Sequence, residues 1–401
     1  MDRFATAERA AERALEESRR LHFATARTNA RRVLEAFRAA RVGEYDFAPS
    51  VGYGYGDRGR DTLNAVFASA LGCEAALVRQ QIASGTHAIS LALWGVLRPG
   101  GELLVATGEP YDTLQSVLGL RATPRSFAEW GITTRLLDLA EGLDPQQLRA
   151  ALSARTQAVL FQRSRGYHDR PALLPQDLLP ALLELRKAGV VSLVDNCYGE
   201  FVAEEEPAAD LLIGSLTKNP GGGLALGGGY VAGRKELVEA VADRLTAPGL
   251  GADVGSFPAG KRSLFQGLFL APHAVAEALA VADYAAAFAK SLGYHVDPLP
   301  LSERGDIVQV LRFGAKEPLL RFARALQEHS PVESSARPEP AELPGYPDPV
   351  LMAGGTFVAG ASLELSMDAP LRAPYAGYLQ GGISSAYGVE ILRQAFLAAE
   401  Q

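Results

Sequence analysis

Ile213-Gly-Ser-Leu-Thr-Lys218-Asn-Pro-Gly-Gly-Gly223 is the stretch from which the fold and chemistry of this chain can be argued. The apolar run at residues 210–213 is short, unbroken and followed at once by turn residues, which predicts a buried strand. After that strand, the hydroxyls of Ser215 and Thr217 flank Lys218, and the glycines let backbone N–H groups approach a ligand closely. Burial is expected to lower the pKa of Lys218 and to leave an amine that can attack a carbonyl carbon.

A phosphorylated aldehyde is the kind of ligand that suits this stretch. Pyridoxal 5′-phosphate (PLP) has both groups, a phosphate and an aldehyde that forms a Schiff base with lysine. A lysine in a Gly-rich turn is, taken alone, more often an ordinary surface residue. The strand-like run at residues 190–196 favours PLP because it contains Asp195, and a carboxylate is needed to keep the pyridine nitrogen protonated. Asp195 and Lys218 would meet at the same rim of a parallel sheet, where open α/β sheets bind ligands.

Composition and charge narrow the class of protein. The chain has 401 residues, 48% of them hydrophobic and 21% charged, which is typical of a globular protein with a large core and room for two domains. The net charge of −7 gives no basic excess, so we expect no nucleic-acid partner. We find no uninterrupted apolar run long enough to span a bilayer and no signal-peptide pattern. The two cysteines imply no disulfide framework. The expected location is the cytoplasm. The scattered histidines and the absence of a C-x-x-C motif predict no metal site.

A second signal for phosphate binding lies at Ser84-Gly85-Thr86, between a strand-like segment and an apolar helix. The N-terminus of a helix presents unpaired N–H groups and stabilises a phosphate, although a Ser/Thr helix cap with no ligand is about as common. Tyr111 follows a strand predicted at residues 103–107, where its ring could stack on a cofactor or simply be part of the core. Strands and helices alternate through residues 78–233, which predicts an α/β fold with a mostly parallel sheet.

A glycine-rich segment, residues 51–60, offers a rival interpretation. Gly54, Gly56 and Gly59 match the G-x-G-x-x-G pattern of dinucleotide-binding proteins, but the pattern needs a buried strand directly before it, and residues 45–50 make a poor strand. We favour a loop whose polar side chains reach an anionic ligand. The candidate residues are Tyr55, Arg58 and Arg60.

The chain is expected to divide into an N-terminal arm, a large domain and a smaller C-terminal domain. Residues 1–45 predict a helical arm, residues 46–271 a large PLP-binding domain, and residues 272–401 a bridging helix with a smaller α+β domain. Strands are expected at residues 306–313 and 356–365. Arg372 is a candidate clamp for a substrate carboxylate, but a lone arginine is more often in a surface ion pair. The apolar residues expected to face inward from the arm are Leu15, Leu21, Phe23, Val33, Leu34 and Phe37.

Taken together, several motifs resemble one family, the PLP-dependent methionine γ-lyase-like or "aluminium resistance" proteins, which are related to cystathionine β- and γ-lyases. The resemblance covers nearly the whole chain. The motifs are Ser84-Gly-Thr-His87, Gly108-Glu-Pro-Tyr-Asp112, Gln162-Arg-Ser-Arg-Gly-Tyr167, Val194-Asp-Asn-Cys-Tyr-Gly-Glu-Phe201, Ser215-Leu-Thr-Lys-Asn-Pro-Gly-Gly222 and Tyr378-Leu-Gln-Gly-Gly382.

The resemblance implies fold type I of the PLP enzymes and a homotetramer, or at least a dimer, with active sites shared between subunits. It implies that Lys218 carries the cofactor, Asp195 pairs with the pyridine nitrogen and Tyr111 stacks on the ring. A Tyr-x-Arg pair of the related lyases reaches the phosphate of the neighbouring subunit; here that role falls to Tyr55 with Arg58 or Arg60. The phosphate itself would be held by Ser84, Gly85, Thr86, Ser215 and Thr217.

The function that this resemblance implies is a carbon–sulfur lyase acting on a sulfur amino acid such as cystathionine, cysteine or methionine. Two alternatives stay open. An aminotransferase uses the same lysine, carboxylate and phosphate cradle, and only it needs a 2-oxo acid acceptor. A binding or regulatory protein on the same fold is the other, because fold alone does not decide function.

Overall fold

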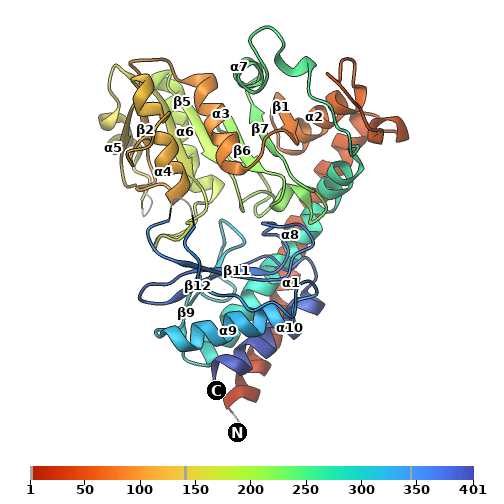
Figure 1. Ribbon diagram of the computed structural model, residues 1–401, viewed down its shortest axis with the longest axis vertical. Helices are drawn as coiled ribbons and strands as arrows, with labels where there is room; N and C mark the ends of the chain where they lie inside the picture. The colour runs from red at the N-terminus through yellow and green to blue at the C-terminus, as the bar shows by residue number, and fades with distance from the viewer. Residues whose placement is uncertain (1–2, 140–141, 344–345) are drawn as a thin grey trace.

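The computed structural model describes residues 3–139, 142–343 and 346–401, which form a large and a small domain joined by two long helices (Figure 1). The large domain contains a seven-stranded sheet with the strand order β1-β7-β6-β5-β4-β2-β3. β7 alone runs antiparallel to its neighbours, so the predicted α/β fold with a mostly parallel sheet is confirmed. The strands are β1 (Ala75–Arg79), β2 (Glu102–Val105), β3 (Thr133–Leu136), β4 (Thr156–Gln162), β5 (Val191–Asp195), β6 (Leu211–Ser215) and β7 (Gly229–Gly233).

Helices cover both faces of this sheet, which explains why its strands read as unbroken apolar runs. Successive side chains of a strand point to opposite faces. In β2, Leu103 packs into one hydrophobic cluster and Leu104 into the other. The helices are α2 (Arg58–Ala70), α3 (Gly85–Val96), α4 (Asp112–Leu118), α5 (Pro145–Ala151), α6 (Pro175–Ala188) and α7 (Lys235–Leu245).

The small domain contains a five-stranded antiparallel sheet with the order β10-β11-β12-β9-β8. Alternation along β11 decides which residues face the large domain: Met367 and Ala369 join the hydrophobic cluster of the small domain, whereas Asp368 points to the opposite face. The helices and strands of this domain are β8 (His295–Asp297), β9 (Gln309–Arg312), α9 (Lys316–Glu328), β10 (Val350–Ala353), β11 (Ser366–Pro370), β12 (Ala376–Gln380) and α10 (Ser385–Ala399).

The strand expected at residues 356–365 is wrong. That segment is a loop, and the strand is β11, which begins at Ser366. Gly354 and Gly360 have positive φ angles of 134° and 77°, conformations that interrupt a strand and suit glycine. The other predicted strand, at residues 306–313, corresponds to β9, which is shorter.

Two helices, α1 (Arg3–Ala39) and α8 (Arg262–Ser291), lie along one another through both domains (Figure 1). Leu15 and Val33 of α1 are buried as predicted. Leu21, Phe23 and Leu34 were expected to face inward and do not: their exposed fractions are 50%, 66% and 48%. A single straight helix can turn only one stripe toward α8, and these three residues lie outside it.

The helix α8 differs from its prediction in two ways. It begins at Arg262 rather than at Pro272, which lies buried inside it, so the expected domain boundary at residue 271 falls within a helix. By length and composition α8 could also cross a membrane, contrary to expectation. Most of its apolar side chains are packed in the hydrophobic clusters of the two domains, which accounts for its composition.

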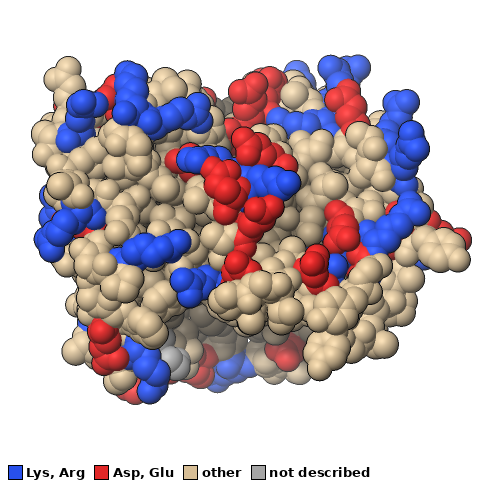
Figure 2. All heavy atoms as spheres, turned by 90° about the horizontal axis from the view of Figure 1, so that it is seen from above, with Lys and Arg blue, Asp and Glu red and all other residues tan. Residues whose placement is uncertain are grey.

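Seen from above, the large domain carries basic and acidic side chains interspersed on one face (Figure 2). On that face neither sign of charge forms a continuous surface.

Candidate active site

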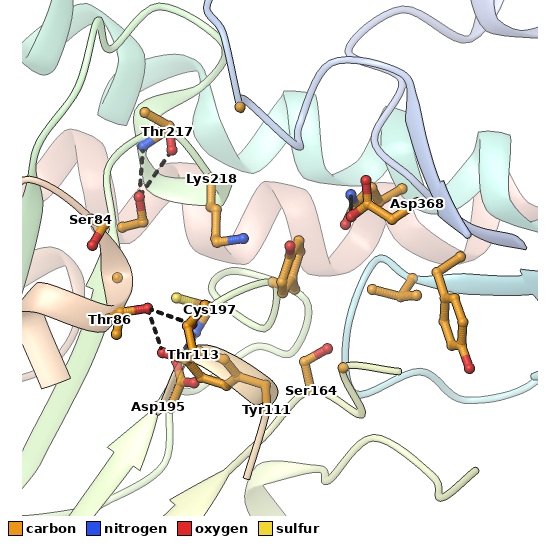
Figure 3. Close-up of a pocket in the computed structure, with 18 of the residues that line it drawn as sticks. Ser84, Thr86, Tyr111, Thr113, Ser164, Asp195, Cys197, Thr217, Lys218 and Asp368 are labelled. Carbon is orange, nitrogen blue, oxygen red and sulfur yellow. Dashed lines mark hydrogen bonds between the residues drawn. The ribbon is translucent and has the colours of Figure 1, made fainter. Parts of the chain in front are cut away.

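A cavity of about 440 Å³ lies between the two domains, at the carboxyl ends of β4, β5 and β6 (Figure 3). The large domain supplies its floor and the small domain its facing wall, which includes Asp368. Asp195 and Lys218 both line it, in the arrangement that the two strand ends predicted. This rim is where an open α/β sheet binds a ligand.

Lys218 follows β6 in a tight turn that only small residues allow. A Cβ atom on Gly221 would lie 1.8 Å from the backbone oxygen of Leu216, so this glycine is required by a close approach of the backbone to itself. The Asn219 side chain donates to the backbone oxygen of Glu200 at 2.9 Å and fixes the turn against the segment after β5. The Lys218 Nζ lies 3.5 Å from the centroid of the Tyr198 ring and points into the cavity.

The expected lowering of the Lys218 pKa is wrong. Burial does lower it, but Tyr198, Cys197 and Asp195 act in the opposite direction, and together they raise the pKa above its ordinary value. An ammonium group over an aromatic ring and near a carboxylate is stabilised as the cation. The sequence could show the burial but not the contact with Tyr198.

Asp195 is a buried carboxylate, and no cation of the described residues lies within ion-pair distance of it; Lys218 acts on it only from farther away. Its Oδ1 accepts a hydrogen bond from the Cys197 backbone N–H at 3.2 Å, and its Oδ2 accepts from the Gln162 side chain at 3.4 Å. Burial raises the pKa of Asp195, because neither neutral donor replaces the water that an anion loses. A protonated pyridine nitrogen would supply the missing positive charge, so this residue fits PLP.

The predicted phosphate cradle is also assembled. Ser84 caps α3, its hydroxyl accepting from the His87 N–H at 3.1 Å, and the hydroxyls of Ser215 and Thr217 lie 3.0 Å apart on the adjoining turn. A Cβ atom on Gly85 would lie 3.3 Å from the Cys197 sulfur, so glycine keeps this corner open. A helix N-terminus beside two hydroxyls suits a phosphate.

Tyr111 stands at the start of α4, with its hydroxyl 2.9 Å from the Thr86 hydroxyl. Burial first, and the nearby Asp195 second, raise the pKa of Tyr111 well above its usual range. Its contact with Thr86 and its nearness to Asp195 are compatible with stacking on the pyridine ring (Figure 3).

The predicted basic residues are not brought to this cavity by their own chain. Arg58 is 69% exposed and lies 3.4 Å from Asp46. Arg60 is buried and donates to the backbone oxygens of Gly54 and Asp253, so its guanidinium is already bound within the chain. The glycines before them form a loop without a preceding strand, unlike the dinucleotide-binding fingerprint.

Tyr55 in the same loop is 64% exposed and likewise outside the cavity lining. Arg372 forms an exposed ion pair with Asp348 at 3.0 Å, the more common role for a lone arginine. Arg372 therefore does not line the cavity in its own chain, and its role as a clamp for a substrate carboxylate stays a prediction.

Sequence reasoning missed several residues that line the cavity. Gln162, Cys197 and Tyr198 lay inside motifs that were recognised, and only the geometry shows that their side chains face the site. Asp368 carried no local signal, because its strand was predicted too early in the chain. Other lining residues that the sequence reasoning missed include Tyr167, Tyr346, Tyr378 and Gln380.

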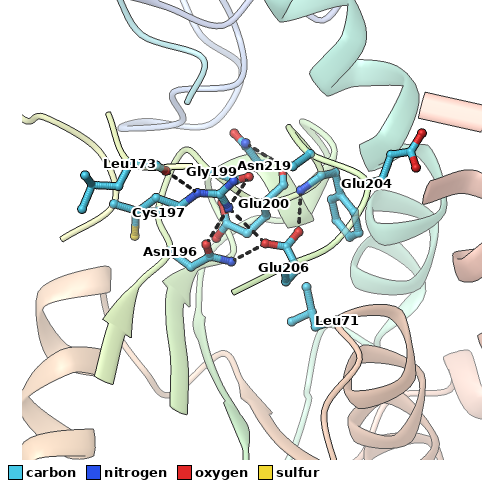
Figure 4. Close-up of polar contacts among 12 residues, drawn as sticks. Leu71, Leu173, Asn196, Cys197, Gly199, Glu200, Glu204, Glu206 and Asn219 are labelled. Atoms are coloured by element: carbon cyan, nitrogen blue, oxygen red, sulfur yellow. Dashed lines mark hydrogen bonds and ion pairs between the residues drawn. The ribbon is translucent and has the colours of Figure 1, made fainter. Parts of the chain in front are cut away.

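Beneath the cavity, a buried polar network holds the segment that carries Asp195 (Figure 4). Arg163 donates to the Asn196 side chain at 2.9 Å, to the Gly199 backbone oxygen at 2.7 Å and to Glu206 at 3.1 Å. Glu206 in turn accepts from the Phe201 N–H at 2.7 Å. Both members of this ion pair are inaccessible to solvent, which makes the network rigid but sensitive to the loss of either charge.

Comparison with known proteins identifies the family. The sequence profile of methionine γ-lyase matches residues 4–397. The chain belongs to the methionine γ-lyase family. Its curated relatives in this family include the uncharacterized protein YnbB of Bacillus subtilis, 44% identical over 362 residues that cover 88% of this chain and 86% of YnbB.

Solved structures of the family superpose along the full chain. One from Listeria innocua, provisionally described as a cystathionine β-lyase involved in aluminium resistance, is 42% identical, with a TM-score of 0.96 and 100% of both chains covered. A carbon–sulfur lyase involved in aluminium resistance from Clostridium novyi is 38% identical, with a TM-score of 0.94, covering 100% of this chain and 96% of that one. The PLP-dependent protein YhfS of Escherichia coli, 19% identical with a TM-score of 0.56, shares the fold alone, which is fold type I as the resemblance implied.

Proposed function

We propose that this protein is a PLP-dependent carbon–sulfur lyase that acts on a sulfur amino acid. The observation that carries the proposal is the placement of Asp195 and Lys218 on one cavity wall, with the phosphate cradle beside them. The buried carboxylate needs a cation, the lysine can bind an aldehyde and the cradle suits a phosphate. PLP presents these three complementary groups in one molecule.

When bound, PLP supplies an electron sink that accepts charge from the α-carbon of an amino acid. Asp195 would keep the pyridine nitrogen protonated, and its buried position strengthens that pairing. Lys218, once displaced by the amine of the substrate, would take the α-proton as general base. Tyr111 would fix the orientation of the ring from the side of Thr86.

The overall reaction balances with water as the only other reactant. A thioether amino acid loses its α-proton, the carbon–sulfur bond at the β or γ carbon breaks, and the sulfur leaves as a thiol after protonation. Water then releases the nitrogen as ammonia, and the carbon skeleton leaves as a 2-oxo acid. No oxidant or reductant is consumed.

The assembly and location are part of the same proposal. We infer a cytoplasmic homotetramer, a dimer of dimers, in which Tyr55 and Arg58 reach the phosphate site of a neighbouring subunit. Both side chains are exposed on their own chain, as such a role requires, whereas Arg60 is not. The partner of each site is a small amino acid, not a nucleic acid or a membrane.

The test is a visible absorbance spectrum of the purified protein before and after addition of L-cystathionine, with assays for pyruvate and 2-oxobutyrate. We expect a band from lysine-bound PLP that is absent in Lys218→Ala, and 2-oxo acid release that needs no acceptor. Lys235→Ala, an exposed lysine at the start of α7, is the control and should keep both. Turnover that requires an added 2-oxo acid would indicate an aminotransferase. A protein that cannot be reconstituted with PLP would contradict the proposal.

A further inference from the structure

The wall of the cavity opposite Lys218 carries a second carboxylate, Asp368 (Figure 3). It projects from β11 of the small domain, on the face of the sheet that Met367 and Ala369 leave free. Its Oδ2 accepts a hydrogen bond from the Gln380 side chain at 3.2 Å, and the nearby Tyr167 hydroxyl acts to lower the pKa of this carboxyl. Both neighbours are neutral.

Three tyrosines surround this carboxylate. The ring of Tyr167 lies 5.0 Å from that of Tyr378 and 5.9 Å from that of Tyr346, measured between centroids. The Tyr378 hydroxyl donates to the Tyr167 backbone oxygen at 2.9 Å, which fixes two of the rings relative to one another. All three rings line the cavity. A carboxylate beside several aromatic faces is the chemistry that binds an ammonium group.

The balance of charged side chains in the cavity also favours a bound cation beside Asp368. This step rests on the proposed function. Among the described residues that line the cavity, Lys218 is the only one with a cationic side chain, against Asp195 and Asp368. With the cofactor in place, Asp195 has the pyridine nitrogen as its counter-charge, and Lys218 is taken up by the aldehyde. Asp368 then faces the substrate with no positive charge beside it. Burial raises the pKa of Asp368, so a cation bound beside it would stabilise its ionised form.

We propose that Asp368, with Tyr167, Tyr346 and Tyr378, forms a subsite for a cationic amine on the leaving-thiol half of the substrate. The α-amine of the substrate is excluded as its ligand, because that amine must react at the opposite wall beside Lys218. The substrate class is therefore a thioether amino acid with an ammonium group beyond the scissile carbon–sulfur bond. A neutral thioether such as methionine would cover Asp368 without supplying a counter-charge, and a carboxylate removed from water without a partner weakens binding.

The test uses two substrates that differ only at this position. S-(2-aminoethyl)-L-cysteine and S-propyl-L-cysteine have the same number of non-hydrogen atoms, and both give pyruvate on elimination. A charge-assisted hydrogen bond is expected to favour the aminoethyl compound about 10- to 100-fold in kcat/KM. Asp368→Asn should abolish that preference, chiefly by lowering kcat/KM for the aminoethyl compound. Asp348→Asn, which alters a surface carboxylate, is the control and should keep the preference.

Calorimetric binding to Lys218→Ala, which cannot turn over, gives a readout that does not depend on catalysis. The aminoethyl compound should bind more tightly than the propyl compound, and the difference should vanish in Lys218→Ala/Asp368→Asn. Equal binding of the two compounds would overturn the subsite. So would an equal loss of activity toward both in Asp368→Asn, because that loss indicates a counter-ion for Lys218 or a structural role. If the wild-type protein turns over neither these compounds nor L-cystathionine, the lyase proposal fails, and the calorimetric comparison still decides the subsite.

Discussion

Replacing Arg163 with methionine should destabilise the protein strongly, because its guanidinium holds together the segment beneath the cavity. The change removes the donors to Leu173, Asn196 and Gly199 and leaves Glu206 as a buried charge without its cation. Breaking a buried ion pair from one side costs about 3–5 kcal/mol. Methionine fills most of the volume, so the loss of packing adds little.

The assay is equilibrium unfolding in urea, followed by fluorescence, at one fixed protein concentration so that assembly does not differ between samples. We expect Arg163→Met and Glu206→Gln each to lower the unfolding free energy by about 3–5 kcal/mol. The double variant should cost about 2 kcal/mol less than the sum, because both changes break the same contacts. Affinity for PLP should fall alongside, since Asp195 and Cys197 begin the segment that the network fixes.

Arg149→Met is the matched control, an exposed arginine paired with Glu184, and should change the unfolding free energy by about 0.5 kcal/mol or less. The reasoning is refuted if Arg163→Met costs less than about 1 kcal/mol. It is also refuted if the two single costs add within about 0.5 kcal/mol, since residues that share a network should couple.

Three further predictions concern the site and its surroundings. Gly85→Ala should weaken PLP binding about tenfold, or about 1.4 kcal/mol, because the new Cβ meets the Cys197 sulfur at 3.3 Å; unchanged affinity in a spectral titration would remove Gly85 from the cradle. Burial raises the pKa of Glu200 from 4.5 to about 8. The stability that this group contributes is therefore fully present below pH 4.5 and is lost progressively as the pH rises from 4.5 to about 8. The loss should run at about 1.4 kcal/mol per pH unit, and Glu200→Gln, which stays neutral, should flatten it in urea unfolding at pH 5 and 8; an identical pH dependence in both proteins would contradict the assignment. Arg60→Ala should lower the unfolding free energy by about 2 kcal/mol and Arg58→Ala by less than about 0.5 kcal/mol, because only the first is buried and bonded to backbone oxygens; equal costs would mean that the burial of Arg60 contributes nothing.

The large domain could be predicted closely because its signals are local. Each buried strand is a short apolar run bounded by turn residues, and the parallel order brings Asp195 and Lys218 to one rim. The small domain gave weaker signals, since the half-exposed strand β11 alternates and the glycines before it belong to a loop. Arg372 and Asp368 are close in sequence, yet only Asp368 faces the cavity, because β11 ends at Pro370 and Arg372 lies in the turn that follows, paired with Asp348.

The raised pKa of Lys218 lay beyond prediction for a different reason. It depends on a ring brought to 3.5 Å from another segment of the chain, and no spacing in the sequence encodes that distance. The same is true of the tyrosines around Asp368, which come from widely separated segments. Sequence motifs can indicate that a site exists, whereas the pKa values of its groups follow from tertiary contacts.

The helix α8 has a mechanical consequence for how ligands reach the cavity. A helix of 30 residues whose first half is embedded in one domain and whose second half is embedded in the other acts as a strut. Bending it would break backbone hydrogen bonds inside two cores at once, so we expect the walls of the cavity to keep their spacing. We then expect substrate and product to pass by movement of the loop at residues 354–365 and by side-chain rotation, rather than by movement of whole domains. Cutting the chain at residue 271 would divide α8 and leave neither half with a complete hydrophobic core.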